Sequence, residues 1–232
     1  MRRSIWLSGG AVTLVSALAL AMNILPGNPA PSAPREGHCR PSAAFVDRPR
    51  PNPLPFERLV SHEEGIVITA PLPHVLAAAR SQSLEDTIQE GGSLPYVTGT
   101  YMLTPGEFDL AGSRRLTCLS DDSTLVEEIL ERRETTNPAE FRYVVWNYTS
   151  SAAAAVDYGV GRFVHRQLAD GQTEVRWTYG FKLRRDRWPG FLGPLGDFLF
   201  RRFFLQGDYA RMMQATLASS KAHAEGTEAA RQ

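Results

Sequence analysis

The chain has 232 residues, of which 43% are hydrophobic and 22% are charged, and its 25 basic residues balance 25 acidic ones. This composition fits a packed globular protein. The lack of a basic surplus argues against a nucleic-acid binder, because phosphate contacts need an excess of Lys and Arg. Two cysteines exclude a scaffold of several disulfides and a four-thiolate metal site. A ligand-binding or enzymatic domain remains.

The first residues predict an export signal or a membrane anchor. Arg2 and Arg3 precede an uncharged run over 4–25, with an A-L-A triplet at 19–21. A positive start, an apolar stretch and small residues two apart are typical of a signal peptide. The run is also long enough for an uncleaved helix that crosses a bilayer with its arginines inside. We therefore expect residues 1–25 to direct the protein to the periplasm or another extracytoplasmic location, either released or tethered.

The segment 26–55 is predicted to be a linker. It holds nine prolines, which fix φ and remove backbone donors, so neither a helix nor an inner strand is expected. An extended, semi-rigid spacer fits this composition. Cys39 lies in the linker and Cys118 in a predicted strand. They are either two free thiols or a disulfide that folds the spacer back onto the domain.

From Phe56 onward the pattern favours strands, two short helices and one long helix. The predicted strands cover residues 58–69, 96–103, 113–119, 124–132, 141–149, 156–168 and 173–184. The predicted helices cover 71–80, 83–89 and 194–222, with a disordered tail at 223–232. Hairpin turns are expected at Asp121-Asp122 and Asp170-Gly171. Consecutive strands closed by one helix indicate a single α+β domain over 56–222 with an antiparallel sheet.

The last hairpin predicts which residues share a face. A turn centred on Asp170-Gly171 pairs Arg162 with Tyr179. On this register the interior face carries Tyr158, Arg162, Trp177, Tyr179 and Phe181. The opposite, solvated face carries His165 and a pair of glycines, Gly161 and Gly180, that would let the sheet bend.

Arg162 is unexpected on that apolar face, because burying a guanidinium costs several kcal/mol unless it is paired. Around Asp121-Asp122 the more apolar face also carries Glu127, a candidate partner for Arg162 inside the concavity of the sheet. The pair would be a polar anchor at the bottom of a hydrophobic pocket. Alternatively, Arg162 extends to the rim of the pocket, or the register is shifted by one residue.

Three segments resemble the START-like (SRPBCC) superfamily, which includes polyketide cyclases, Bet v 1 and lipid-transfer proteins. They are "EGIVITAPLPHVLAAA", the middle run "LAGSRRLTCLSDDSTLVEEILERRE" with "FRYVVWNYTS", and "GQTEVRWTYGFKL" before a long C-terminal helix. The resemblance covers about residues 57–222. It implies a helix-grip fold, in which a curved antiparallel sheet wraps around the C-terminal helix and two short helices follow the first strand. It also implies an apolar cavity for a hydrophobic small molecule such as a lipid, sterol, quinone or polyketide.

The residues supply little catalytic chemistry. The histidines are scattered without metal-ligand spacing, and neither a nucleophile elbow nor a phosphate-binding glycine loop is present in the sequence. We therefore predict no catalytic residue, metal or cofactor, and binding of a hydrophobic ligand in the cavity. The predicted ligand-binding residues are Glu127, Tyr158, Arg162, Trp177, Tyr179 and Phe181.

Two other functions stay open. A cyclase or dehydratase of the polyketide type would use buried tyrosines, for which Tyr143, Tyr158 and Tyr179 are candidates. A structural or protein-interaction module would instead fill the cavity with its own side chains. A membrane surface is a further expected partner, contacted through Trp188, Phe191 and the nearby arginines 184 and 185.

Overall fold

The computed structural model describes residues 39–88 and 93–229, with side chains up to residue 226. The predicted leader, residues 1–25, and the first part of the predicted linker, 26–38, lie outside the described residues. Within the described part of the chain, no helix combines the length and apolar character that crossing a membrane requires.

The observed elements follow the predicted order closely. The strands are β1 (Val60–Ile68), β2 (Val97–Met102), β3 (Arg114–Leu119), β4 (Thr124–Arg133), β5 (Ala139–Trp146), β6 (Val156–Gln167) and β7 (Thr173–Leu183). The helices are α2 (Leu72–Ser81), α3 (Leu84–Thr87), α4 (Pro194–Phe200) and α5 (Ala210–Ala229). Short 3₁₀ turns are η1 (Phe56–Arg58), η2 (Ser151–Ala153), η3 (Ala169–Gly171) and η4 (Gly190–Leu192).

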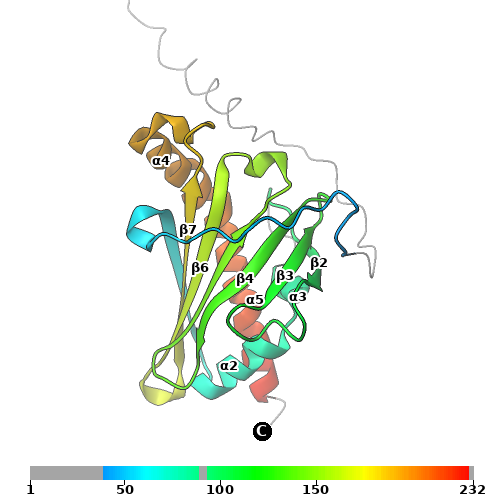
Figure 1. Ribbon diagram of the computed structural model, residues 1–232. Coiled ribbons are helices and arrows are strands. Elements are labelled where there is room, and N and C mark those ends of the chain that lie inside the picture. The colour runs from blue at the N-terminus through cyan, green and yellow to red at the C-terminus, as the bar shows by residue number, and fades with distance from the viewer. Residues whose placement is uncertain (1–38, 89–92, 230–232) are drawn as a thin grey trace, which may run out of the picture. The chain divides into compact units, whose positions relative to one another are not determined.

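The strands form one antiparallel sheet in the order β1-β7-β6-β5-β4-β3-β2. β1 forms one edge of the sheet by pairing with β7, and the other strands follow as a meander. In Figure 1 α5 lies behind one face of the sheet, and the segment that precedes β1 crosses in front of the other. We call these the inner face and the outer face. The α+β helix-grip architecture predicted from the sequence is therefore confirmed.

The inner face forms the main core. Alternate residues of β7, namely Trp177, Tyr179 and Phe181, are at most 4% exposed. They pack with β1 against the C-terminal helix, of which Leu205 and Met213 are completely buried. Burial of such apolar side chains is the main force that holds the helix against the inner face. We call the space between the inner face and the C-terminal helix the grip.

The outer face is covered by residues 39–56, which we call the strap. Beneath it lies a second buried cluster that includes Val144, Trp146 and Val160. The Trp146 indole N–H donates to the carbonyl of Arg48 over 3.0 Å. The described part of the predicted linker is thus extended, as its prolines require, but it packs on the sheet instead of standing free.

A disulfide joins the strap to β3. Cys39 and Cys118 are bonded, with their Cα atoms 5.6 Å apart. Arg50 adds an ion pair with Glu128 of β4 at 3.0 Å. Of the two alternatives left by the sequence, the structure has the disulfide, and the strap is folded back onto the domain as that alternative requires.

The predicted registers of the β3–β4 and β6–β7 hairpins are each wrong by one residue. Arg162 pairs with Thr178, not Tyr179, and Gly161 takes the place opposite Tyr179. Because side chains alternate between faces, a shift of one residue exchanges the two faces of a strand. From Tyr158 onward, the even-numbered residues of β6, including Arg162, therefore lie on the outer face.

The C-terminal helix is interrupted. A π-helical segment, η5 (Arg201–Tyr209), separates α4 from α5, and within it Gly207 has non-helical backbone angles. The single helix predicted over 194–222 is thus divided near its middle. α5 also runs on to Ala229, so the predicted tail is helical up to that residue.

Candidate functional site

The inner face carries a buried cluster of four tyrosines, which we call the tyrosine cluster: Tyr143, Tyr148, Tyr179 and Tyr209. β5 supplies Tyr143, the chain after β5 supplies Tyr148, β7 supplies Tyr179 and η5 supplies Tyr209. The rings of Tyr179 and Tyr209 lie 5.1 Å apart, and those of Tyr143 and Tyr179 lie 6.1 Å apart. Sheet and helix thus both contribute to one polar site inside the grip.

Two glycines of β6 make room for these side chains. A Cβ atom at Gly159 would lie 2.5 Å from the hydroxyl of Tyr179 and 2.9 Å from that of Tyr148. A Cβ atom at Gly161 would lie 2.1 Å from the ring of Tyr143. Only glycine allows the tyrosines to cross β6 this closely.

Burial raises the pKa of all four tyrosine hydroxyls well above the usual value. The nearby carboxylate of Glu127 raises the pKa of Tyr143, Tyr148 and Tyr209 further. The hydroxyls therefore stay protonated at neutral pH, when they can donate hydrogen bonds but cannot act as bases.

An ion pair borders the tyrosine cluster. Glu127 of β4 is 6% exposed, and one of its carboxylate oxygens accepts hydrogen bonds from Arg115 of β3 at 2.7 and 2.6 Å. The Arg115 guanidinium also lies over the ring of Phe108, 3.9 Å from its centroid. A buried carboxylate needs such a partner, because an unpaired charge away from water is very costly.

Two buried hydroxyls on this side of the grip lack a hydrogen bond of ordinary geometry among the described residues. They are the Tyr148 hydroxyl, which lies beside Tyr179, and the Thr117 hydroxyl of β3. Buried polar groups are nearly always satisfied in folded proteins. Each hydroxyl could bond a ligand oxygen or an ordered water.

The β7 side of the grip is filled by the protein's own aromatic rings. Trp177 stacks on Phe163 with centroids 4.8 Å apart, and its indole N–H donates to the Tyr143 hydroxyl over 3.2 Å. Phe181 packs edge-on against Phe200 at 5.6 Å. Towards β5, by contrast, Phe163 is only partly buried. Phe141 of β5 is likewise only partly buried, so the rings at these two positions are less completely packed than those of β7.

The predicted site residues fall into two groups. Glu127, Trp177, Tyr179 and Phe181 lie on the inner face, whereas Tyr158 and Arg162 lie on the outer face. The predicted pair of Arg162 with Glu127 is wrong, because Arg162 bonds Glu140 at 2.7 Å instead. Its side chain is 41% exposed, as the alternative of a shifted register requires.

Tyr158 lies under the strap. Its hydroxyl accepts a hydrogen bond from the backbone N–H of Leu54 over 3.0 Å. The ring is 4% exposed and packs in the outer cluster. It therefore fixes the strap to β6 and has no access to the grip.

His165 is also placed differently from the prediction, which put it on a solvated face. It is 8% exposed, stacks near Phe163 at 6.1 Å and faces inward. Burial and the nearby Arg132 lower the pKa of His165 to about 4. The imidazole is therefore neutral at neutral pH.

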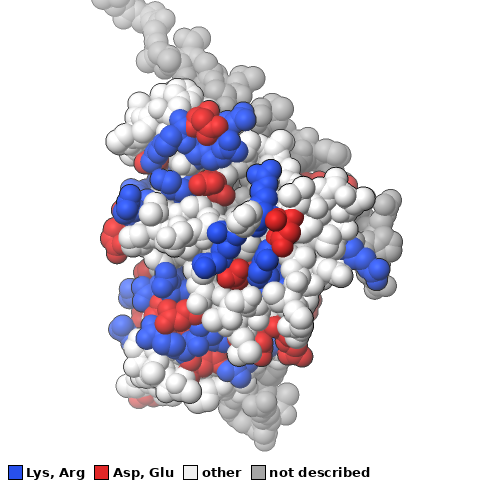
Figure 2. Space-filling view, viewed as in Figure 1, with Lys and Arg blue, Asp and Glu red and all other residues white. Residues whose placement is uncertain are grey.

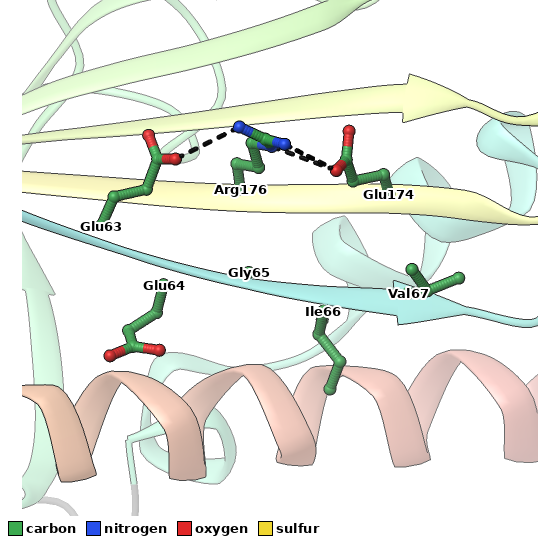
Figure 3. Close-up of a pocket in the computed structure, with 7 residues that line it drawn as sticks. All are labelled: Glu63, Glu64, Gly65, Ile66, Val67, Glu174 and Arg176. Carbon is green, nitrogen blue, oxygen red and sulfur yellow. Dashed lines mark hydrogen bonds and ion pairs between the residues drawn. The ribbon is translucent and has the colours of Figure 1, made fainter.

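A shallow groove runs along the edge strand β1, as Figure 3 shows. Glu64 and Ile66 point towards the helix, while Glu63, Arg176 and Glu174 form a charged row on the other side of the strand. The groove lies at the edge of the sheet and is open to solvent, so it differs from the enclosed pocket that the resemblance implies. Among the described residues, no three acidic, His or Cys side chains are grouped to hold a metal ion.

Comparison with solved structures reveals the same fold in proteins of very different sequence. The crystal structure of Ara h 8.0201 matches 72% of this chain and 97% of its own, with a TM-score of 0.52 and 11% identity. The Zhui aromatase/cyclase from Streptomyces sp. R1128 matches 71% of this chain and 93% of its own, with a TM-score of 0.50 and 13% identity. A hypothetical protein from Helicobacter pylori matches 78% and 99%, with a TM-score of 0.52 and 11% identity.

These likenesses establish the START-like fold that the sequence resemblance indicated. No family model and no curated protein matches the chain. Since a fold hosts many functions, the function must be argued from the residues of the inner face.

Proposed function

We propose that the domain binds a hydrophobic small molecule that carries at least one oxygen, over the inner face of β3, β4 and β5. The observation that carries this proposal is the buried tyrosine cluster beside the Arg115–Glu127 pair, in which the Tyr148 hydroxyl interacts with that of Tyr179. The nearby strand β3 adds the buried Thr117 hydroxyl, which has no hydrogen-bond partner among the described residues. Specific ligand sites combine apolar walls with a few well-placed polar groups. The half-buried Phe141 supplies such a wall.

The chemistry of the lining favours a ligand with a carbonyl or hydroxyl group. Neutral phenols can donate to a carbonyl oxygen without the cost of burying a charge. Phe141, Phe163 and Trp177 present rings inclined to one another by only 23° and 16°, which suits contact with a flat or unsaturated ligand. Each buried methylene of the ligand would add about 0.8 kcal/mol.

One fold neighbour is consistent with such ligands in a general way. It is an aromatase/cyclase, whose name implies cyclic aromatic products. We therefore place lipids, sterols, quinones and polyketide-like molecules in the ligand class. We further propose that the protein works outside the cytoplasm, which the predicted leader and the Cys39–Cys118 disulfide support, because disulfides persist in oxidising compartments.

Native mass spectrometry of the protein purified from its host tests the proposal. We expect a bound mass of a lipid-like compound that is reduced at least tenfold in Tyr148→Phe, because a ligand hydrogen bond is lost. The matched control is Tyr158→Phe, which removes a hydroxyl from the outer face and should leave the ligand bound. An empty wild-type protein that also fails to bind added quinones, sterols and fatty acids would refute the proposal. A self-filled interaction module would then be the better account.

A cyclase-type activity is a second candidate, because the tyrosine cluster places several neutral proton donors beside a carboxylate. A buried tyrosine of this kind could donate its proton to the alkoxide oxygen that forms on the attacked carbonyl as a ring closes, while the carboxylate takes up the proton lost from the attacking carbon. Incubation with linear poly-β-keto thioesters distinguishes the two functions: turnover that is lost in Tyr179→Phe favours the enzyme, and binding without turnover favours the carrier.

A further inference from the structure

Large apolar side chains are exposed around α4. Phe191, Leu195 and Phe198 are 57%, 57% and 58% exposed, and Phe203 is 48% exposed. Leu195 and Phe198 are three residues apart in a helix and therefore share one face. Isolated exposed apolar residues are ordinary, but a group of this kind marks an interaction surface.

The opposite side of α4 is already used by the core. Gly196 and Phe200 are its buried residues, and Phe200 packs against Phe204 with centroids 4.8 Å apart. A helix that covers a sheet needs only one apolar stripe. The exposed stripe of α4 is therefore additional to what the fold requires.

Arginines border this exposed stripe. Arg201 and Arg202 are exposed, and neither forms an ion pair with a described residue. Arg202 instead lies over the ring of Phe203, 6.0 Å from its centroid. Arg185, by contrast, is held by Asp197 at 2.8 Å. Figure 2 shows an uncharged surface at the α4 end, upper left, with basic and acidic side chains beside it.

We propose that this surface, the α4 patch, docks on an anionic membrane: it consists of Phe191, Leu195, Phe198, Arg201, Arg202 and Phe203. Interfacial helices combine exposed aromatic and Leu side chains, which enter the headgroup region, with cations that attract anionic lipids. A second copy of the chain fits less well, since a two-fold interface would bring the same unpaired arginines close to each other.

The patch differs from the membrane contact expected from the sequence. Trp188 is half-buried and its indole N–H is enclosed, and Arg184 is paired with Asp186 at 2.9 Å. The contact therefore centres on α4, with Phe191 at its border. This inference goes beyond ligand binding, and its test uses no ligand.

The test places an environment-sensitive NBD fluorophore on Phe198→Cys in the full chain. Vesicles of phosphatidylcholine and phosphatidylglycerol at 3:1 carry doxyl-labelled lipid as quencher. We expect lipid quenching of the probe at 198 to be at least fivefold stronger than at Leu110→Cys, a control position that is 69% exposed in a loop between β2 and β3. Because the probe reports local burial, a contribution of residues 1–38 to vesicle binding does not affect the comparison.

A second variant tests the arginines. Arg201→Gln combined with Arg202→Gln should reduce docking of the 198 probe on anionic vesicles by about 30-fold, from about fivefold per basic residue near the surface. The control is Arg48→Gln combined with Arg166→Gln, which removes two exposed arginines elsewhere. Equal quenching at 198 and 110 would overturn the proposal. So would a change of the 198 probe with protein concentration in the absence of lipid, which would indicate a second copy.

Discussion

The disulfide between the strap and β3 makes a quantitative prediction. Cys39 and Cys118 are 79 residues apart. For a loop of this length, the loss of chain entropy in the unfolded state stabilises the protein by about 4.5 kcal/mol at 25 °C. Domains of ordinary stability have only about 5–15 kcal/mol in total, so the bond contributes a large share. Cys39→Ser combined with Cys118→Ser should therefore remain folded at 25 °C but unfold far more easily.

Urea unfolding followed by circular dichroism measures this effect. With an m value of about 2.5 kcal/mol/M, the midpoint should fall by about 1.5–2 M in the double variant. Wild type in reducing buffer should show the same shift, whereas the double variant should not respond to the reductant. A midpoint that is unchanged by both treatments would contradict the reasoning, because it would mean that the strap's other contacts constrain the chain without the bond.

Three further substitutions probe the inner face. Gly161→Ala should destabilise the protein by more than about 3 kcal/mol in urea unfolding, because the new methyl group overlaps the ring of Tyr143. His165→Asn should make the free energy of unfolding less dependent on pH on the acid side. In wild type the folded pKa of His165 is about 4, so the unfolded state takes up the proton first as the pH falls. The free energy of unfolding of wild type therefore decreases by up to about 3 kcal/mol between pH 6.5 and 4. Glu127→Gln should cost about 3 kcal/mol at pH 7, because Arg115 is left as a buried charge without its partner.

Two of these predictions have a matched control, and each has a result that would contradict it. Gly226→Ala, in α5 with open space around it, should be neutral or stabilise by up to about 1 kcal/mol; a loss as large as that of Gly161→Ala would disprove the steric argument. Arg162→Gln removes a 41% exposed partner of Glu140 and should cost less than about 1 kcal/mol; a cost equal to that of Glu127→Gln would count against the assigned pairs. An unchanged pH profile in His165→Asn would place the acid sensitivity elsewhere.

The order of the elements could be predicted from the sequence because local residue patterns indicate each strand and helix. Period-two alternation, the helix-breaking prolines and the Gly-containing turns gave every strand within about two residues at most ends. The register could not be predicted, because it depends on the number of residues in each hairpin loop. The sequence predicts a two-residue turn for both loops, yet the innermost pairs are Cys118 with Thr124 and Gln167 with Thr173. Each loop holds an odd number of residues, which exchanges the faces.

The error in register decides which of the predicted site residues are assigned to the correct face of the sheet. Trp177, Tyr179 and Phe181 were placed correctly because β7 alone determines their face, whereas Tyr158 depended on the register. Tyr148 was missed for another reason. Alternation would place it on the outer face with Trp146, but the left-handed backbone of Asn147 between them, with φ of 58°, breaks the alternation. The residue type of Asn147 is a weak signal for this turn, because Asn adopts positive φ more readily than most residues.

The strap also bears on how the protein should be produced. The apparent domain start at Phe56 follows the last proline, and a recombinant chain begun there would look reasonable from the sequence. It would leave Val144, Trp146 and Val160, which are at most 3% exposed, without their cover. Such a truncated chain would present an apolar sheet surface to water and aggregate. Expression should therefore begin ahead of Cys39, in a host compartment where thiols are oxidised.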